Sequence, residues 1–110
     1  MNTSSILKQE TIDELTRLIV QAAHPRRIVL FGSAARGRMG PHSDLDVLVV
    51  MPDGVHRRRT AGNIYRALSG FGYSKDIVVV TEDDVQRFGG EPSLVIYPAL
   101  KDGKELYRAS

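Results

Sequence analysis

The sequence predicts an α/β (α+β) fold in which one small mixed β-sheet is flanked by helices, within a single domain over residues 1–110. Two observations support this prediction. Helix-like and strand-like segments alternate along most of the chain, and no repeat or linker divides them. A chain of 110 residues, of which 42% are hydrophobic and 25% charged, is long enough to bury one hydrophobic core.

The first half of the chain is expected to contain one long helix and two strands. Thr11 and Glu14 have the spacing of a capping box, in which Thr would be the N-cap. Apolar residues then recur at helical spacing as far as His24 and Pro25, where the helix should end. The segments expected after it are, in order, a strand at 28–31, one or two helical turns at 34–36 and a strand at 44–50.

The second half is expected to begin with another long helix, at 57–69, which is stopped by Gly70. Tyr65 falls on the apolar stripe of this helix, so we interpret it as a core residue. The segments that follow are, in order, a strand at 75–80, a helix that starts at 81–84, a helix at 93–100 and a short strand that ends at 107.

The composition excludes several classes of protein. The chain has no cysteine, so a metal would need oxygen or imidazole ligands. No apolar run approaches the roughly 18 residues that a membrane span needs. The first residues, MNTSSILKQE, lack the features of a signal peptide, so we expect a cytoplasmic protein without membrane contact. The net charge of +2 is too mild to indicate direct nucleic-acid binding.

The one dense basic run is His56-Arg57-Arg58-Arg59. Such a run is usually a solvated helix face. The alternative is a patch that binds phosphate or an acidic partner.

Two aspartates stand one residue apart at the start of a predicted strand. Asp44 and Asp46 lead into the apolar run VLVV, and residues i and i+2 of a strand point to the same face. Like charges held this close repel, and their desolvation is costly without a cation, so the pair indicates a metal site. Asp76 opens the next predicted strand in the same way. If the two strands are neighbours, three carboxylates can meet and provide the oxygen ligands that Mg²⁺ prefers.

A Gly-Ser turn precedes the aspartates. Gly32 and Ser33 directly follow a predicted strand, where exposed backbone N–H groups and a hydroxyl can bind an anion. Taken singly, Gly-Ser pairs are mostly turns, and Asp-x-Asp pairs are often caps or surface charges. Phosphate donors beside a cation site, however, are the layout of a site for a nucleoside triphosphate.

The joint spacing resembles a known family. Gly32-Ser33, ten residues, Asp44-Leu45-Asp46 and a later strand that opens with Asp76 resemble the nucleotidyltransferases of the DNA polymerase β superfamily. More narrowly, LFGSAARGRMGPHSDLDVLVV is similar to the minimal nucleotidyltransferase (MNT) branch, with the core motif at 28–80, and SLVIYPALKDGKELY is similar to the tail of that branch. The resemblance implies the polymerase β-type nucleotidyltransferase fold.

The resemblance implies a role for each matching residue. Gly32 and Ser33 would hold the β- and γ-phosphates of ATP. Asp44 and Asp46 would be ligands shared by two Mg²⁺ ions. Asp76 would be the third ligand, on the catalytic metal, and would accept the proton of the acceptor hydroxyl.

Two residues between these motifs have less defined roles. Arg36 matches the arginine that follows the Gly-Ser turn in the family, where it would contact a phosphate or, equally, form a salt bridge between helix and loop. His42 lies in the loop before the aspartates. We expect it to be solvated or to cap a turn, since this chemistry gives histidine no obligatory part.

The resemblance also implies a partner. One small sheet offers only half a cleft, and the sequence shows no acceptor-binding domain after Ser110, so we expect another chain to supply the acceptor. In the MNT branch that chain is a HEPN-domain toxin, and the MNT protein is the antitoxin that transfers AMP from ATP to a tyrosine of the toxin. Two alternatives stay open. One is an O-nucleotidyltransferase of a small hydroxylated compound such as an aminoglycoside, and the other is a non-catalytic antitoxin that acts by occlusion.

Overall fold

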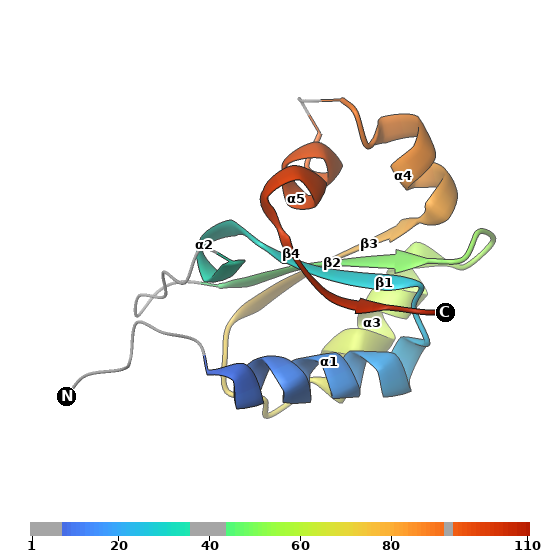
Figure 1. Cartoon of the computed structure of the whole chain (residues 1–110). Coiled ribbons are helices and arrows are strands. Elements are labelled where there is room, and N and C mark those ends of the chain that lie inside the picture. The colour runs from blue at the N-terminus through green and yellow to red at the C-terminus, as the bar shows by residue number, and fades with distance from the viewer. Residues whose placement is uncertain (1–7, 36–43, 92–93) are drawn as a thin grey trace.

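A central β-sheet lies between two layers of helices in the computed structural model, which describes residues 8–35, 44–91 and 94–110 (Figure 1). In chain order the elements are α1 (Gln9–Ala23), β1 (Arg27–Phe31), α2 (Gly32–Ala35), β2 (Leu45–Met51), α3 (Arg57–Ala67), β3 (Lys75–Thr81), α4 (Glu82–Phe88), α5 (Ile96–Asp102) and β4 (Lys104–Arg108).

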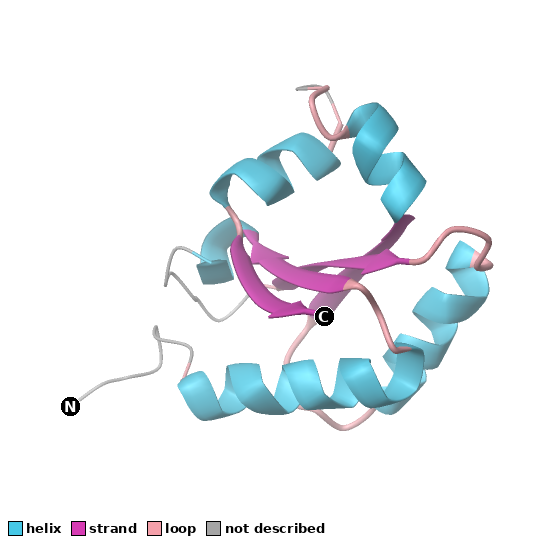
Figure 2. Ribbon diagram, turned by 45° about the vertical axis from the view of Figure 1, so that its right-hand side comes forward, coloured by secondary structure: helices cyan, strands magenta, loops and turns pink. Residues whose placement is uncertain are grey.

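The sheet is mixed, as predicted. Its strand order is β3-β2-β1-β4, in which β2 and β3 are parallel and the other neighbours are antiparallel. A parallel pair needs a crossover connection, and helix α3 provides it. Helices α1 and α3 cover one face of the sheet and α4 and α5 cover the other, while α2 lies at one end (Figure 2). None of the described helices is long and apolar enough to cross a membrane.

Helix α1 begins earlier than predicted. It starts at Gln9 with Lys8 as its N-cap residue, and the backbone N–H of Thr11 already donates to the Lys8 carbonyl at 3.0 Å. The predicted capping box at 11–14 is therefore wrong. Glu14 instead pairs with Arg17, one turn further along the helix. The predicted end at His24 is confirmed, because this residue caps the helix in the left-handed conformation with φ of 50°.

The start of helix α4 matches its prediction and is linked to the basic run. Thr81 Oγ1 accepts from the Asp84 backbone N–H at 3.1 Å, and Asp84 Oδ2 accepts from the Thr81 N–H at 2.9 Å. The Arg57 side chain donates to the same carboxylate at 2.8 and 2.9 Å, and these hydrogen bonds hold the pKa of Asp84 below its ordinary value. Arg57 thus joins the start of α3 to α4, while Arg58 and Arg59 are exposed.

The remaining elements agree with the predictions apart from their ends. Helix α5 begins at Ile96, later than predicted, and Pro98 falls in its first turn, where a missing N–H is tolerated. The interpretation of Tyr65 as a core residue is wrong, because this residue is 40% exposed and does not belong to the core.

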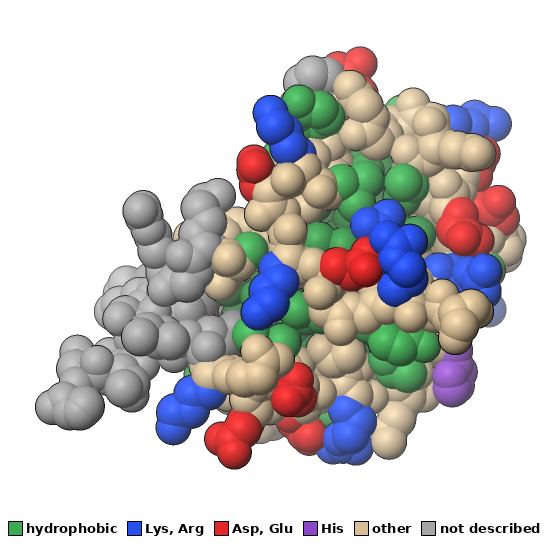
Figure 3. Space-filling view, viewed as in Figure 1, with side chains coloured by type: hydrophobic (Ala, Val, Ile, Leu, Met, Phe, Trp, Pro, Cys, Tyr) green, Lys and Arg blue, Asp and Glu red, His purple; other side chains and the backbone are tan. Residues whose placement is uncertain are grey.

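Acidic and basic side chains are interspersed on the face of the molecule seen in Figure 3. On the neighbouring strands β1 and β4, for example, Glu105 accepts hydrogen bonds from Arg27 at 3.1 Å and from Arg108 at 2.7 Å. Exposed ion pairs of this kind contribute little stability individually. The fold is stabilised mainly by the hydrophobic clusters beneath these ion pairs.

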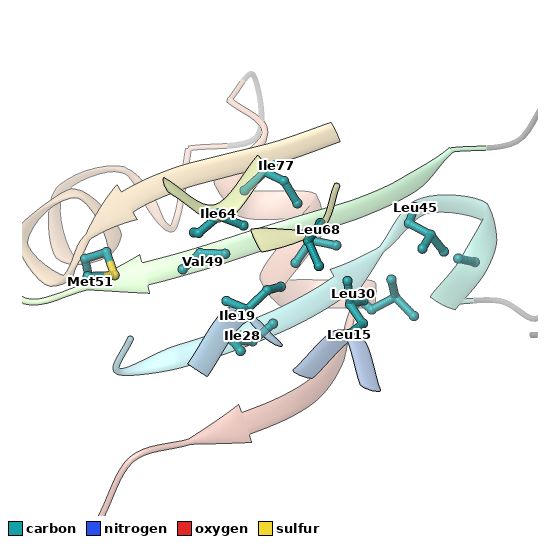
Figure 4. Packing of buried hydrophobic residues seen from close by; sticks show 12 residues of the cluster. Leu15, Ile19, Ile28, Leu30, Leu45, Val49, Met51, Ile64, Leu68 and Ile77 are labelled. Atoms are coloured by element: carbon teal, nitrogen blue, oxygen red, sulfur yellow. The ribbon is translucent and has the colours of Figure 1, made fainter. Parts of the chain in front are cut away.

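A hydrophobic cluster fills each face of the sheet. On the α1/α3 side, Leu15, Ile19 and Ile64 from the helices pack against alternate residues of the strands (Figure 4). On the α4/α5 side, Ile96 and Ala99 pack against the opposite residues of the same strands. Strand β2 is therefore buried on both faces, which explains its uninterrupted apolar run. This central strand also places Asp46, and Asp44 immediately before it, at one end of the sheet.

Candidate active site

Three of the predicted site residues, Gly32, Asp46 and Asp76, lie in a row at one end of three neighbouring strands. Asp46 of β2 pairs with Phe31, the last residue of β1, and on its other side it pairs with Asp76 of β3. Gly32 follows Phe31 directly and starts α2. Residues paired in register in neighbouring strands project to the same face, and neighbouring strands lie about 4.8 Å apart. The second and third strands are thus neighbours, which is the condition that the metal-site hypothesis set, and their register places Asp46 and Asp76 side by side.

Gly32 lies so close to the Asp46 carboxylate that a side chain at this position would displace one of the two. Its φ is +72°, in the left-handed region, and a Cβ built on it would overlap Asp46 Oδ2. Glycine is favoured here both by the backbone conformation and by the lack of a side chain. The turn predicted to bind phosphate therefore lies directly beside a carboxylate predicted to bind metal.

Asp46 is the electrostatic centre of the cluster. Its pKa is raised above the ordinary value, chiefly because burial disfavours the charged form, and further because the charges of Asp76 and Asp44 repel that form. Asp44 lies immediately before β2, and both it and Asp76 are exposed. The site is thus a partly buried negative centre between two exposed carboxylates, an arrangement that a cation would stabilise.

The donor set fits Mg²⁺ in its chemistry, although the cage is not closed. Among the described residues, no three acidic or histidine side chains are gathered tightly enough to hold a metal ion as they stand. Carboxylate oxygens are nonetheless the ligands that Mg²⁺ prefers. Because like charges repel, three carboxylates are more stable apart until a cation lies between them. Asp44 and Asp76 are both exposed, so their side chains are not held away from Asp46 by core packing.

The structure places some of the other predicted residues and not others. Ser33 is the second residue of α2, on the same turn as Gly32, and is partly exposed. Arg36 and His42 lie outside the described residues, so their predicted roles stay predictions.

Tyr65 is a residue of the site region that sequence reasoning missed. It comes from α3, and its hydroxyl oxygen accepts a hydrogen bond from the backbone N–H of Ile77 at 2.9 Å. Ile77 directly follows Asp76 in the edge strand β3. The only signal in the sequence was a hydroxyl group on an otherwise apolar stripe, and that stripe favours a core interpretation.

The raised pKa of Asp46 predicts an unusual pH dependence of stability. The folded state binds this proton more tightly than the unfolded chain does, so stability falls as pH rises from the ordinary aspartate pKa through the raised one. In chelator, Asp46→Asn should therefore melt at a higher temperature than the parent at pH 7. The difference should shrink as the pH falls toward the ordinary aspartate range. Thermal melts at several pH values measure this, and a lower melting temperature of the variant at pH 7 would contradict it.

Several solved structures share this fold. A Sulfolobus solfataricus protein described as a nucleotidyltransferase matches with a TM-score of 0.60 and 19% identity, covering 90% of this chain and 78% of that one. A chain in the complex of the tri-AMPylated Shewanella oneidensis HEPN toxin with its MNT antitoxin matches with a TM-score of 0.59 and 17% identity, covering 94% and 74%. A toxin–antitoxin structure with AMP-PNP matches with a TM-score of 0.59 and 21% identity, covering 94% and 76%. At these identities the likeness shows the fold.

The family itself is shown by the sequence. A comparison with proteins of curated function finds no match. The model of the nucleotidyltransferase domain family, in contrast, matches residues 12–105, which include the Gly-Ser turn and all three aspartates. The family predicted from the motif spacing is thereby confirmed, and the chain belongs to the nucleotidyltransferase domain family.

Proposed function

We propose that this chain is the MNT-type antitoxin of a HEPN/MNT pair. In this proposal it transfers AMP from ATP, with Mg²⁺, to a hydroxyl of a partner HEPN toxin, and the hydroxyl is that of a tyrosine. The observation that carries the proposal is the row formed by Gly32, Asp46 and Asp76 within a domain of the nucleotidyltransferase family. An occluding subunit would gain nothing from such an acidic cluster, which destabilises the metal-free fold.

Each residue has a part in the proposed reaction. The backbone N–H groups at Gly32 and the Ser33 hydroxyl bind the β- and γ-phosphates. Asp44, Asp46 and Asp76 are the residues that would hold two Mg²⁺ ions, which when bound supply the positive charge that offsets charge on the phosphates. Asp76, exposed at the edge strand, accepts the proton of the acceptor hydroxyl.

The bond changes follow from this arrangement. The acceptor oxygen bonds to the α-phosphorus of ATP, and the bond from that phosphorus to the oxygen bridging to the β-phosphate breaks. Pyrophosphate leaves with the electron pair of the broken bond, and the hydroxyl proton moves to Asp76. The products are the AMP ester of the acceptor and pyrophosphate.

The proposed partner is supported by the fold and by the openness of the site. The same fold occurs in a complex of an MNT antitoxin with an AMPylated HEPN toxin and in a toxin–antitoxin structure with AMP-PNP. Asp44 and Asp76 are exposed, so a hydroxyl of another protein can reach them.

Labelled ATP tests the proposal directly. The chain is incubated with ATP labelled in its α-phosphate and with a HEPN-domain protein as the candidate acceptor. Label should appear on the HEPN protein with Mg²⁺ present, and transfer should stop in excess chelator. Undiminished transfer in chelator would refute the metal requirement. Fast labelling of an aminoglycoside by this chain alone would overturn the antitoxin assignment in favour of a small-molecule transferase.

A further inference from the structure

Asp76 lies on a strand with only one neighbour in the sheet. Strand β3 is at the edge of the order β3-β2-β1-β4, so among the described residues no strand pairs with its other side. Asp76 is also near the beginning of β3, where an edge strand frays most easily. A carboxylate with a part in phosphoryl transfer must nevertheless be held within about 0.5 Å of its working position.

The inner side of this strand end is held by the sheet. Just before β3 begins, the backbone carbonyl of Ser74 accepts a hydrogen bond from the Leu45 N–H at 2.9 Å. From there the parallel ladder pairs Asp76 with Asp46 and Ile77 with Val47. This ladder restrains the side of β3 that faces β2.

The outer side is held by the Tyr65 side chain. Its hydroxyl oxygen accepts from the Ile77 N–H at 2.9 Å, in a partly buried hydrogen bond that comes from α3 and not from a strand. The side chain of Ile77 is itself buried, at 6% exposure, and it packs in the cluster under α1 and α3. The peptide unit between Asp76 and Ile77 is therefore held at its N–H by Tyr65. The Ile77 side chain that follows this peptide is held by the core.

We infer that Tyr65 is a positioning residue for Asp76 in the proposed transfer reaction, and this inference rests on the proposed function. The Tyr65 hydroxyl fixes the plane of the peptide that follows Asp76 and so sets the direction in which this carboxylate leaves the edge strand. It also occupies a backbone donor that an added strand would use. The exposure of Tyr65 agrees with this role, because a ring kept for core packing alone would be buried.

Tyr65→Phe tests the inference, since it removes the hydroxyl and keeps the ring. Tyr73→Phe is the matched control. Tyr73 is exposed in the loop before β3, where its ring lies 5.8 Å from that of Phe71, and within the described part of the chain its hydroxyl has no hydrogen bond. The measurements are hydrogen exchange at the Ile77 amide, kcat and KM for ATP in transfer to the HEPN protein, and the melting temperature.

The expected result separates positioning from stability. In Tyr65→Phe the Ile77 amide should exchange about fivefold faster or more, as the loss of one hydrogen bond implies. kcat should fall about tenfold with KM for ATP unchanged, as for other residues that orient a ligand to a metal. Tyr73→Phe should match the parent in all three measurements.

Three outcomes would overturn the inference. If Ile77 exchange is unchanged, the hydrogen bond does not hold the strand. If exchange rises while kcat stays at the parent value, or only the melting temperature falls, the hydrogen bond is structural and does not position Asp76. If the parent itself transfers no AMP, the proposed function fails and the inference fails with it. The activity of the parent distinguishes this outcome from the other two.

Discussion

Asp46→Asn should reduce AMP transfer by about 100- to 1000-fold or more and leave the protein folded and bound to its partner. The substitution keeps the size of the side chain and the geometry of β2, but it removes the most buried negative charge of the predicted metal site. Metal affinity should fall with it, and so should the electrostatic stabilisation of the phosphoryl group. Partner binding should persist because an interface depends on surface complementarity and not on the metals.

The decisive measurement is the RNase activity of the HEPN toxin, with ATP, Mg²⁺ and a substoichiometric amount of each variant. The parent should silence the toxin catalytically, whereas Asp44→Asn, Asp46→Asn and Asp76→Asn should not. Asp102→Asn, an identical substitution at the exposed end of α5, is the matched control and should act like the parent, as should His42→Ala. If the site variants silence the toxin as well as the parent does, occlusion replaces catalysis as the mechanism.

Gly32→Ala should cause the second large loss. A left-handed φ of +72° costs a non-glycine residue about 1–2 kcal/mol. The new Cβ would in addition overlap Asp46 Oδ2, so either the Gly-Ser turn or the carboxylate must move. A displacement of about 1 Å at a reacting centre can reduce a rate about 100-fold. We therefore expect a loss of stability and a loss of transfer of about that size.

Gly54→Ala is the control that separates the two effects of Gly32→Ala, the backbone strain and the overlap with Asp46. Gly54 also has a left-handed φ, of +91°, but a Cβ there would meet nothing within 4 Å. The Gly54→Ala variant should be destabilised by about the same backbone strain energy and should keep its transfer activity. Chemical denaturation and the transfer assay measure both quantities. Equal losses of activity in the two variants would show that contact between Gly32 and Asp46 is not what matters.

The two capping patterns show why local sequence reasoning succeeds in one place and fails in another. Thr81 ends a strand, so the helix after it has to start there, and the predicted box with Asp84 is present. Thr11 has the same pattern with Glu14, but the residues before it can also be helical, and α1 simply continues back to Gln9. A capping pattern defines a helix start only where the preceding residues exclude a longer helix.

The sequence by itself determined the order of the elements and the residue types of the motifs. The apolar runs that form β1, β2 and β3, the glycine at a turn and the paired aspartates are all local features, because they depend on residues a few positions apart. The family was inferred from the resemblance of these motifs and their spacing to known nucleotidyltransferases, and the family model confirmed it.

Only the tertiary structure decided which of these features meet. Asp76 is far from Asp46 in sequence, and the parallel register of β2 and β3 is what places the two side by side. The exposure of Tyr65 and its hydrogen bond to Ile77 depend on where α3 lies relative to the sheet edge. The raised pKa of Asp46 depends on burial by neighbours from other segments. Hydrophobic periodicity shows whether one side of an element is apolar, but it does not show which other element covers that side. The burial of Asp46, the register of β2 and β3 and the electrostatics of the site all depend on which elements pack together.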